Sequence, residues 1–199
     1  NFSLIYEKNE KTDLKVSGKK LKLSKIKFEE DSFFSNHDDL DVDLQVEELF
    51  IGNSKFVSSK INFLKNKGQF ENLFVELMGN EDYHIIKIDG DQNKKKFFLE
   101  SNYAPGFFTL FDIDLKINTG SLKIEGEKNI DSNGYEGLIA GKDFVFLDAP
   151  FLADFISLFS LKGLAQKLKD GGIIFEDLNA KYEFSDGKLR IIDSLIKGS

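Results

Sequence analysis

The chain has 199 residues, and its 27 lysines and arginines against 34 aspartates and glutamates give a formal net charge of −7. A chain of this length can bury a sizeable core in one or two domains. The acidic balance argues against nucleic acid as the main partner, because phosphate backbones are bound by basic surfaces. Cysteine is absent from the sequence, which excludes disulfides, thiol nucleophiles and cysteine-containing metal sites.

Apolar and polar residues alternate through most of the chain, which predicts β-strands. Leu14 and Val16 begin this pattern, and Leu40, Val42 and Leu44 repeat it between acidic residues. Such alternation places apolar side chains on one face of a sheet and polar side chains on the other. In chain order the predicted strands lie within 14–28, 40–46, 61–63, 73–77, 83–88, 96–99, 113–117, 122–124 and 144–147, followed after Gly171-Gly172 by alternating strands around an Asp-Gly turn.

Turn-forming residues separate these segments at intervals of about ten residues. The clearest turn signals are Asn66-Lys67-Gly68, Asp89-Gly90-Asp91, Asn118-Thr119-Gly120, Asn133-Gly134 and Asp186-Gly187. Short connections between strands favour hairpins over βαβ units. We therefore predict a mainly β fold, built from a long meandering antiparallel sheet, and we interpret 31–39 as a loop.

Helical periodicity occurs in two short segments. Between Pro150 and Lys169, apolar residues follow helical spacing, Asp148 can cap the first turn, and Gly171-Gly172 ends the segment. A second, weaker helix is predicted from Ala104 to Phe111, opened by a proline that suits a first turn. The sequence thus predicts one or two short helices beside the sheet.

Nothing in the sequence indicates catalysis. Asp41 and Asp43 share a strand face opposite apolar residues, which favours a solvated surface over an acid–base pair or a calcium site. Asp89–Asn93 resembles a calcium loop, but the downstream glutamate is missing and a plain turn explains it. The two histidines, His37 and His84, lie in unrelated patterns. We therefore expect no catalytic residue, no metal and no cofactor.

The last third of the chain, 133–199, carries the most specific pattern. An apolar strand at 144–147 leads through Asp148-Ala149-Pro150 into the helical segment, then into Gly171-Gly172-Ile173 and a pair of strands around Asp186-Gly187. This order resembles the C-terminal region of the AsmA-like family, the bacterial envelope proteins that include YhdP and are related to TamB. The resemblance is strongest from Tyr135 to Ser199 and extends more weakly upstream.

The resemblance implies that the chain is one β-rich segment, 1–199, of a longer protein, with an upstream sheet at 1–132 and the family-like region at 133–199, including the helix at 150–169. It implies a periplasmic, inner-membrane-anchored protein of a Gram-negative envelope. Its sheet would be strongly curved and U-shaped, with an apolar groove that carries phospholipid between the inner and outer membranes. The implied partners are phospholipid acyl chains, a membrane contacted by other regions of the protein, and other envelope proteins.

The strand pattern fits two arrangements, a closed sandwich or barrel and an open sheet whose apolar face lines a groove. The abundance of phenylalanine and the scarcity of helices favour the groove, because an uncovered apolar face needs another layer or a ligand. The alternative function is a non-enzymatic structural or interaction module in outer-membrane assembly. The phenylalanines of 150–169 fit a core plug or a lipid contact. The candidate groove residues are Phe107, Phe108, Phe111, Phe144, Phe146, Phe151, Phe155, Phe159 and Phe175.

Overall fold

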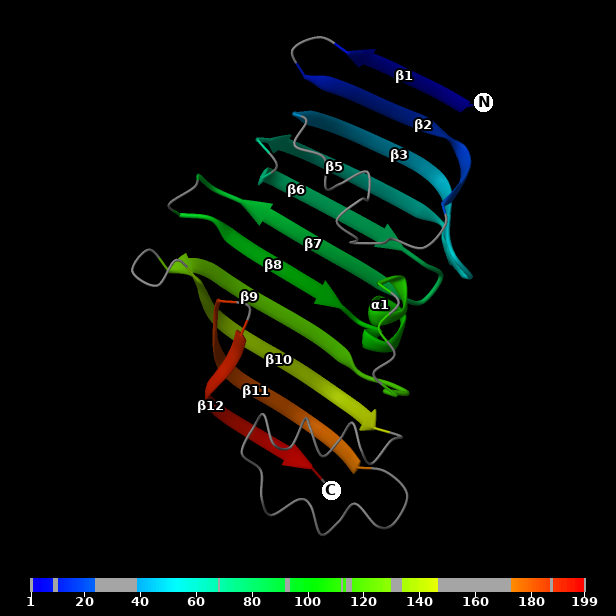
Figure 1. Ribbon diagram of the computed structural model, residues 1–199. Helices are drawn as coiled ribbons and strands as arrows, with labels where there is room; N and C mark the ends of the chain where they lie inside the picture. Colours follow the sequence, from blue (N-terminus) through cyan, green and yellow to red (C-terminus); the bar gives the residue numbers. More distant parts are fainter. Residues whose placement is uncertain are drawn as a thin grey trace.

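The computed structural model describes residues 2–8, 11–23, 39–67, 69–91, 94–111, 113, 116–129, 134–146, 173–186 and 188–198, and a single sheet dominates these residues (Figure 1). Its strands are β1 (Phe2–Lys8), β2 (Thr12–Leu23), β3 (Leu40–Ile51), β4 (Ser54–Phe56), β5 (Ser58–Asn66), β6 (Gln69–Met78), β7 (Tyr83–Asp89), β8 (Lys96–Ser101), β9 (Ser121–Asn129), β10 (Gly134–Phe146), β11 (Ile173–Ser185) and β12 (Lys188–Gly198). One short helix, α1 (Ala104–Leu110), lies between β8 and β9 in the chain.

Neighbouring strands follow one another in the chain, so the mainly β, meandering sheet that the sequence predicts is confirmed. One pair corrects the prediction of an antiparallel sheet. Strands β2 and β3 run parallel, with Val16 opposite Leu44, whereas the other pairs of described strands are antiparallel. A parallel pair needs a long crossover between its strands, and the alternation of each strand carries no information about its direction. The connection itself, 24–38, lies outside the described residues.

The sheet is open, with β1 and β12 at its two edges, and it neither closes into a barrel nor curls strongly (Figure 1). The closed arrangement therefore does not describe these strands. The described sheet also differs from the strongly curved, U-shaped sheet that the resemblance implies.

Strand register separates the sheet into an apolar face and a polar face. We call the apolar face the inner face, and its members lie opposite one another on successive strands. They are Leu40, Val42, Leu44 and Val46 of β3; Ser59, Ile61, Phe63 and Lys65 of β5; Phe70, Leu73, Val75 and Leu77 of β6; His84, Ile86 and Ile88 of β7; Phe97, Leu99 and Ser101 of β8; Leu122, Ile124, Gly126 and Lys128 of β9; Tyr135, Gly137, Ile139 and Gly141 of β10; Leu178, Ala180, Tyr182 and Phe184 of β11; and Leu189 and Ile191 of β12.

The opposite, outer face carries charged residues and aromatic rings. Asp41 and Asp43 lie there, as the alternation predicts, and bond Lys11 and Asn62 respectively. Across β5 to β9, lysine ammonium groups lie 5.4 to 5.8 Å from the ring centroids of Phe74 and Phe98. Cations at these distances are attracted to aromatic faces. Lysine side chains therefore lie over the outer-face rings of Phe74 and Phe98.

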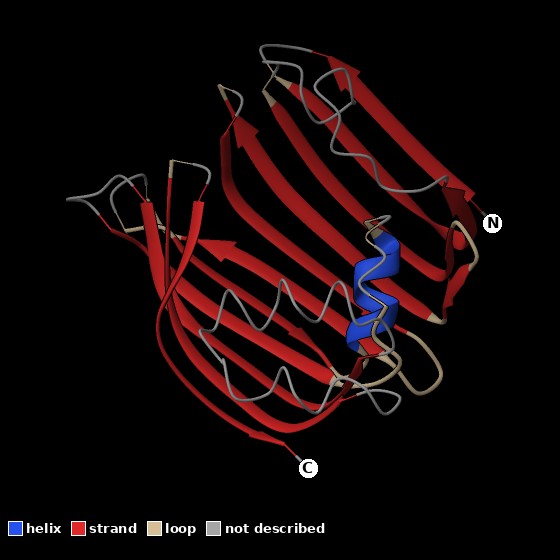
Figure 2. Cartoon of the chain, turned by 60° about the horizontal axis from the view of Figure 1, so that its bottom comes forward, coloured by secondary structure: helices blue, strands red, loops and turns tan. Residues whose placement is uncertain are grey.

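Helix α1 packs on the inner face, where Figure 2 shows it in blue against the strands. Ala104, Phe107 and Leu110 are its buried residues, and Leu110 joins the cluster that contains Leu44, Leu49 and Phe56. Pro105 occupies the first turn, as predicted, because the first helical amides need no partner within the helix. The helix spans 104–110 instead of the predicted 104–111.

A strand predicted within 113–117 is wrong for the residues of that segment that the structure describes. The Phe108 carbonyl accepts hydrogen bonds from the amides of both Phe111 and Ile113, so the chain is still turning out of α1 there. Lys116 has a φ of 50°, which interrupts extended backbone. Ile117 forms only an isolated bridge.

Turns confirm several sequence signals. Gly90 and Gly120 adopt φ values of 106° and 124°, which favour glycine, and Lys67 and Asp186 also have positive φ. The predicted strand at 144–147 is the end of the longer strand β10. The predicted helix at 150–169, including Phe151, Phe155 and Phe159, lies outside the described residues, as do Leu147 and the Asp148 cap.

Candidate functional site

A cavity of about 630 Å³ lies on the inner face. Its lining comes from every strand between β6 and β12: Gln69, Phe70, Ile88, Lys95, Phe97, Ile124, Lys128, Tyr135, Ile139, Tyr182, Phe184 and Leu189. Phe184 and Leu189 are each 42% exposed, so solvent reaches this lining. A volume of this size falls in the range of about 300–1,000 Å³ that is typical of small-molecule sites.

A glycine on β9 lets two rings of this cavity approach the backbone. Gly126 lies opposite Gly137 of β10. A Cβ atom at Gly126 would lie 2.3 Å from the Tyr182 hydroxyl and 2.4 Å from Phe97 Cε1. The missing side chain at Gly126 lets these two rings lie close to the backbone, with their centroids 6.4 Å apart. An aromatic surface therefore lines the cavity where larger residues would fill it.

Tyr182 contributes a neutral hydroxyl to this lining. Its hydroxyl lies 3.5 Å from the Glu125 carbonyl oxygen, to which it donates. Burial raises the pKa of Tyr182 to about 12, because the phenolate would lose its hydration. The ring therefore presents no charge to the cavity at neutral pH.

A second cavity of about 120 Å³ lies between α1 and the sheet. It is lined by Ile61, Phe63, Phe70, Leu73, Val75, Leu77, His84, Ile86, Phe107, Leu110 and Phe111. Phe70 lines both cavities, so they are neighbours along the inner face. We call the two cavities with their lining residues the trough. Helix α1 lies over the smaller cavity of the trough and contributes no residue to the lining of the larger one.

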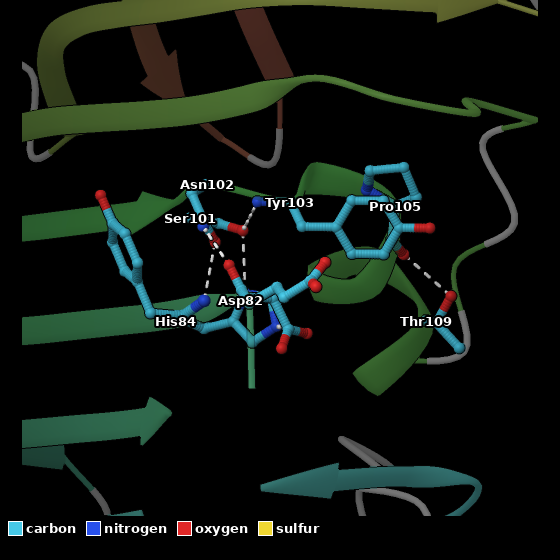
Figure 3. Close-up of polar contacts among 9 residues, drawn as sticks. Asp82, His84, Ser101, Asn102, Tyr103, Pro105 and Thr109 are labelled. Carbon is cyan, nitrogen blue, oxygen red and sulfur yellow. Dashed lines mark hydrogen bonds and ion pairs between the residues drawn. The ribbon is translucent and has the colours of Figure 1, made fainter. Parts of the chain in front are cut away.

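His84 lies buried beneath α1, with 1% of its surface exposed. Its Nδ1 atom is 2.8 Å from Ser101 Oγ, and its Nε2 atom is 3.7 Å from an Asp82 carboxylate oxygen (Figure 3). Its ring packs against Phe56 and Phe107, at centroid distances of 5.8 and 5.9 Å. Burial lowers the pKa of His84, and the nearby Asp82 charge opposes this effect only in part.

The entry to α1 is fixed by hydrogen bonds around the same corner (Figure 3). Ser101 Oγ accepts a bond from the Tyr103 amide at 3.1 Å. The Asn102 side chain accepts from the Tyr83 amide and donates to the Glu81 carbonyl. The Ala104 amide donates to the Gly120 carbonyl at 2.7 Å. These contacts join the ends of β7 and β8 to the helix and hold it over the inner face.

The two faces of the sheet differ in their charged residues. The inner-face positions named above include Lys65, Lys128 and His84 but no aspartate or glutamate. Lys95, directly before β8, also lines the larger cavity. The other face carries both signs, and a depression there is lined by Asp89, Glu125, Glu127 and Glu136 together with Lys87 and Lys96. The trough is therefore apolar with a cationic border, although the chain as a whole is acidic.

The predicted groove residues fall into three groups. Phe107 and Phe111 line the smaller cavity, and Phe108 packs against the buried cluster around Leu122. Phe144 and Phe175 face each other across β10 and β11 in that same cluster, at 4% and 1% exposure. The side chain of Phe146, like Phe151, Phe155 and Phe159, lies outside the described residues.

Sequence reasoning missed most of the larger cavity, including Phe97, Tyr135, Tyr182 and the lysines. Phe97 lies within a predicted strand, so the alternation of that strand could have assigned its side chain to a sheet face. Whether these residues meet depends on pairing between distant strands, because Phe97 and Tyr182 are more than eighty positions apart in the chain. No local pattern carries that information.

The described residues contain neither a cluster of metal ligands nor a helix that could span a membrane. Within them, no group of three or more histidine or acidic side chains is arranged to hold a metal ion. No helix among the described elements is both long and apolar enough to cross a bilayer. The comparisons of this chain with protein-family models, with curated proteins and with solved structures found no match.

Proposed function

We propose that this chain is a segment of a bridge-like lipid-transport protein, in which the trough carries phospholipid acyl chains between the inner and outer membranes of a Gram-negative envelope. The observation that carries the proposal is the continuity of the apolar inner face across the sheet, together with an open cavity along it. The sequence resemblance to the AsmA-like family supports the same function. We propose a periplasmic location for the same reason.

The dimensions of the trough suit an acyl chain. The lining of the larger cavity crosses the sheet from β6 to β12, and Phe70 joins it to the smaller cavity on the same face. An acyl chain can therefore lie along the trough across several strands.

The energetics favour transport along such a surface. Each methylene group exposed to water costs about 0.8 kcal/mol, so a lipid rarely crosses water alone. An apolar lining removes much of this cost at every point along its length. Because the hydrophobic effect is non-directional, a chain can slide without breaking specific bonds.

Native mass spectrometry of the purified chain, with lipid extraction from the same sample, tests the proposal. We expect co-purified phospholipid, and we expect it to be lost when Phe97 on the inner face is changed to Asp. The matched control is Phe98→Asp, because Phe98 is the next residue of β8 and lies on the outer face. Circular dichroism checks that both variants fold. A folded wild-type chain without lipid, after exposure to phospholipid vesicles, would contradict the proposal.

A second candidate function is a structural or interaction module, and the edges of the sheet favour it. Leu4, Ile5 and Tyr6 of β1 are 48–60% exposed. On β12, Ile192 and Leu195 are 55% and 63% exposed. Edge strands offer unpaired backbone groups to a partner strand. A lipid-free protein that forms a stoichiometric complex through these edges would support this second function.

A further inference from the structure

The lysines of the larger cavity form its cationic border. Lys95 and Lys128 are neighbours across β8 and β9, because the Lys128 amide donates to the Lys95 carbonyl at 2.7 Å. Both side chains line the cavity, and both are partly buried. Among the described residues that line the cavity none is acidic, and the others are apolar or aromatic apart from Gln69.

Lys95 is positioned by the sheet itself. Its ammonium group donates to the Phe70 carbonyl on β6 at 2.5 Å, so the side chain lies across the cavity from β8. An ammonium group has three hydrogens, and a single carbonyl oxygen leaves the others available for a second acceptor. The aliphatic stem of such a lysine contacts apolar surface while the charge stays near water.

We propose that the trough prefers anionic phospholipids, and that Lys95 and Lys128 bind the headgroup phosphate while the acyl chains lie over Phe97, Ile124 and Ile139. This inference rests on the proposed function and adds the headgroup class and the orientation of the lipid. Its basis is charge complementarity, since lysines border an apolar cavity in a protein of net charge −7. Phosphate oxygens bound by ammonium groups form charge-assisted hydrogen bonds.

The outer face carries charges of both signs. Its depression is lined by Asp89, Glu125, Glu127 and Glu136 but also by Lys87 and Lys96, whereas the lining of the larger cavity contains lysines and no acidic residue. An anionic ligand therefore meets a lining of net negative charge on the outer face and of positive charge in the cavity.

The test uses the 199-residue chain and vesicles that contain equal amounts of phosphatidylglycerol and phosphatidylcholine. After incubation, native mass spectrometry measures the ratio of the two lipids bound. We expect the wild-type chain to retain more phosphatidylglycerol. We expect the Lys95→Gln, Lys128→Gln double variant to lose about tenfold in phosphatidylglycerol affinity, with a smaller loss for phosphatidylcholine, whose choline ammonium offsets the charge of its phosphate.

Lys96→Gln is the matched control, because Lys96 follows Lys95 but belongs to the outer face, where it lies 4.0 Å from Glu127. This variant removes the same charge and should keep the preference. Excess glycerol phosphate, which has the headgroup without chains, should not displace the lipid. Equal binding of the two lipids by the wild type, or a preference that survives the double substitution, would overturn the headgroup assignment while lipid binding stands. Absence of both lipids from the wild-type chain would instead overturn the proposed function.

Discussion

The Nδ1 atom of His84 lies 2.8 Å from Ser101 Oγ, directly beneath the start of α1. Ser101 Oγ also accepts the Tyr103 amide, so the serine connects the buried imidazole to the residue that begins the helix. If the serine hydroxyl hydrogen points to Nδ1, the neutral ring carries its own hydrogen on Nε2, which faces Asp82. The neutral imidazole therefore supports the position of α1 over the trough.

The first prediction concerns pH. Burial lowers the pKa of His84 below its ordinary value of 6.5, so the unfolded chain binds a proton more readily than the folded chain. The free energy that the neutral His84 ring contributes to folding is fully present above pH 6.5, and it is lost as the pH falls through the lower pKa of the folded state. We expect the urea midpoint to fall between about pH 7.5 and 5.5, and to fall less in His84→Gln, which keeps an acceptor for Ser101. An equal fall in both proteins would contradict this role.

The second prediction compares the substitution of a residue in the sealed core with that of a residue in the trough. Phe56 is 1% exposed and packs in the cluster beneath α1, so Phe56→Ala should cost about 3–5 kcal/mol of unfolding free energy. Phe184 lines the cavity and is 42% exposed, so Phe184→Ala should cost about 1 kcal/mol or less. Urea denaturation measures both. Similar losses would mean that Phe184 is covered in solution.

The third prediction concerns Gly137, where β10 lies close to the backbone of β9. A Cβ atom at Gly137 would lie 1.9 Å from the Glu125 carbonyl oxygen, which belongs to the neighbouring backbone and cannot move aside easily. We expect Gly137→Ala to destabilise the protein by about 2 kcal/mol or more, as overpacking against rigid atoms does. Leu138→Ala is the control, because Leu138 is the next residue and is 50% exposed. Thermal unfolding of both variants would show whether the strands can adjust.

The fourth prediction concerns the sheet edge. Ile5 lies on the edge strand β1 of the described sheet and is 48% exposed. Exposed apolar edge strands promote pairing between chains, and lysine on an edge opposes it. We expect Ile5→Lys to reduce concentration-dependent self-association in sedimentation experiments. Leu138→Lys, at a similarly exposed position on the interior strand β10, should leave self-association as it is. If both variants self-associate to the same extent, the β1 edge does not mediate self-association.

Alternation predicted most of the strands and their faces, but it did not predict β1 or β4 and it placed a strand wrongly within 113–117. Leu40, Val42 and Leu44 are buried and Asp43 is exposed, as period-two spacing requires. Pro105 marked the start of α1 because its fixed φ suits a first helical turn. These features are local, and a single sequence carries them.

The trough itself could not be predicted, because it depends on which residues meet. Gly126 and Gly137 become a pair only once β9 and β10 are in register, and Tyr182 joins them from a distant region of the chain. Phe144 and Phe175 illustrate the same limit. Their apolar character identified an inward face, but alternation does not reveal that other side chains cover them.

The most direct test of the central claim places a photo-crosslinking benzoylphenylalanine at Phe97 or at Phe98 and illuminates the chain with phosphatidylglycerol vesicles. Phe97 lies on the inner face in the larger cavity, whereas Phe98 lies on the outer face between Lys87 and Lys123. The two positions are adjacent, so the local concentration of lipid is matched. We predict lipid adducts at Phe97 and few at Phe98. Equal labelling of both positions, or adducts at neither, would contradict a lipid-binding trough.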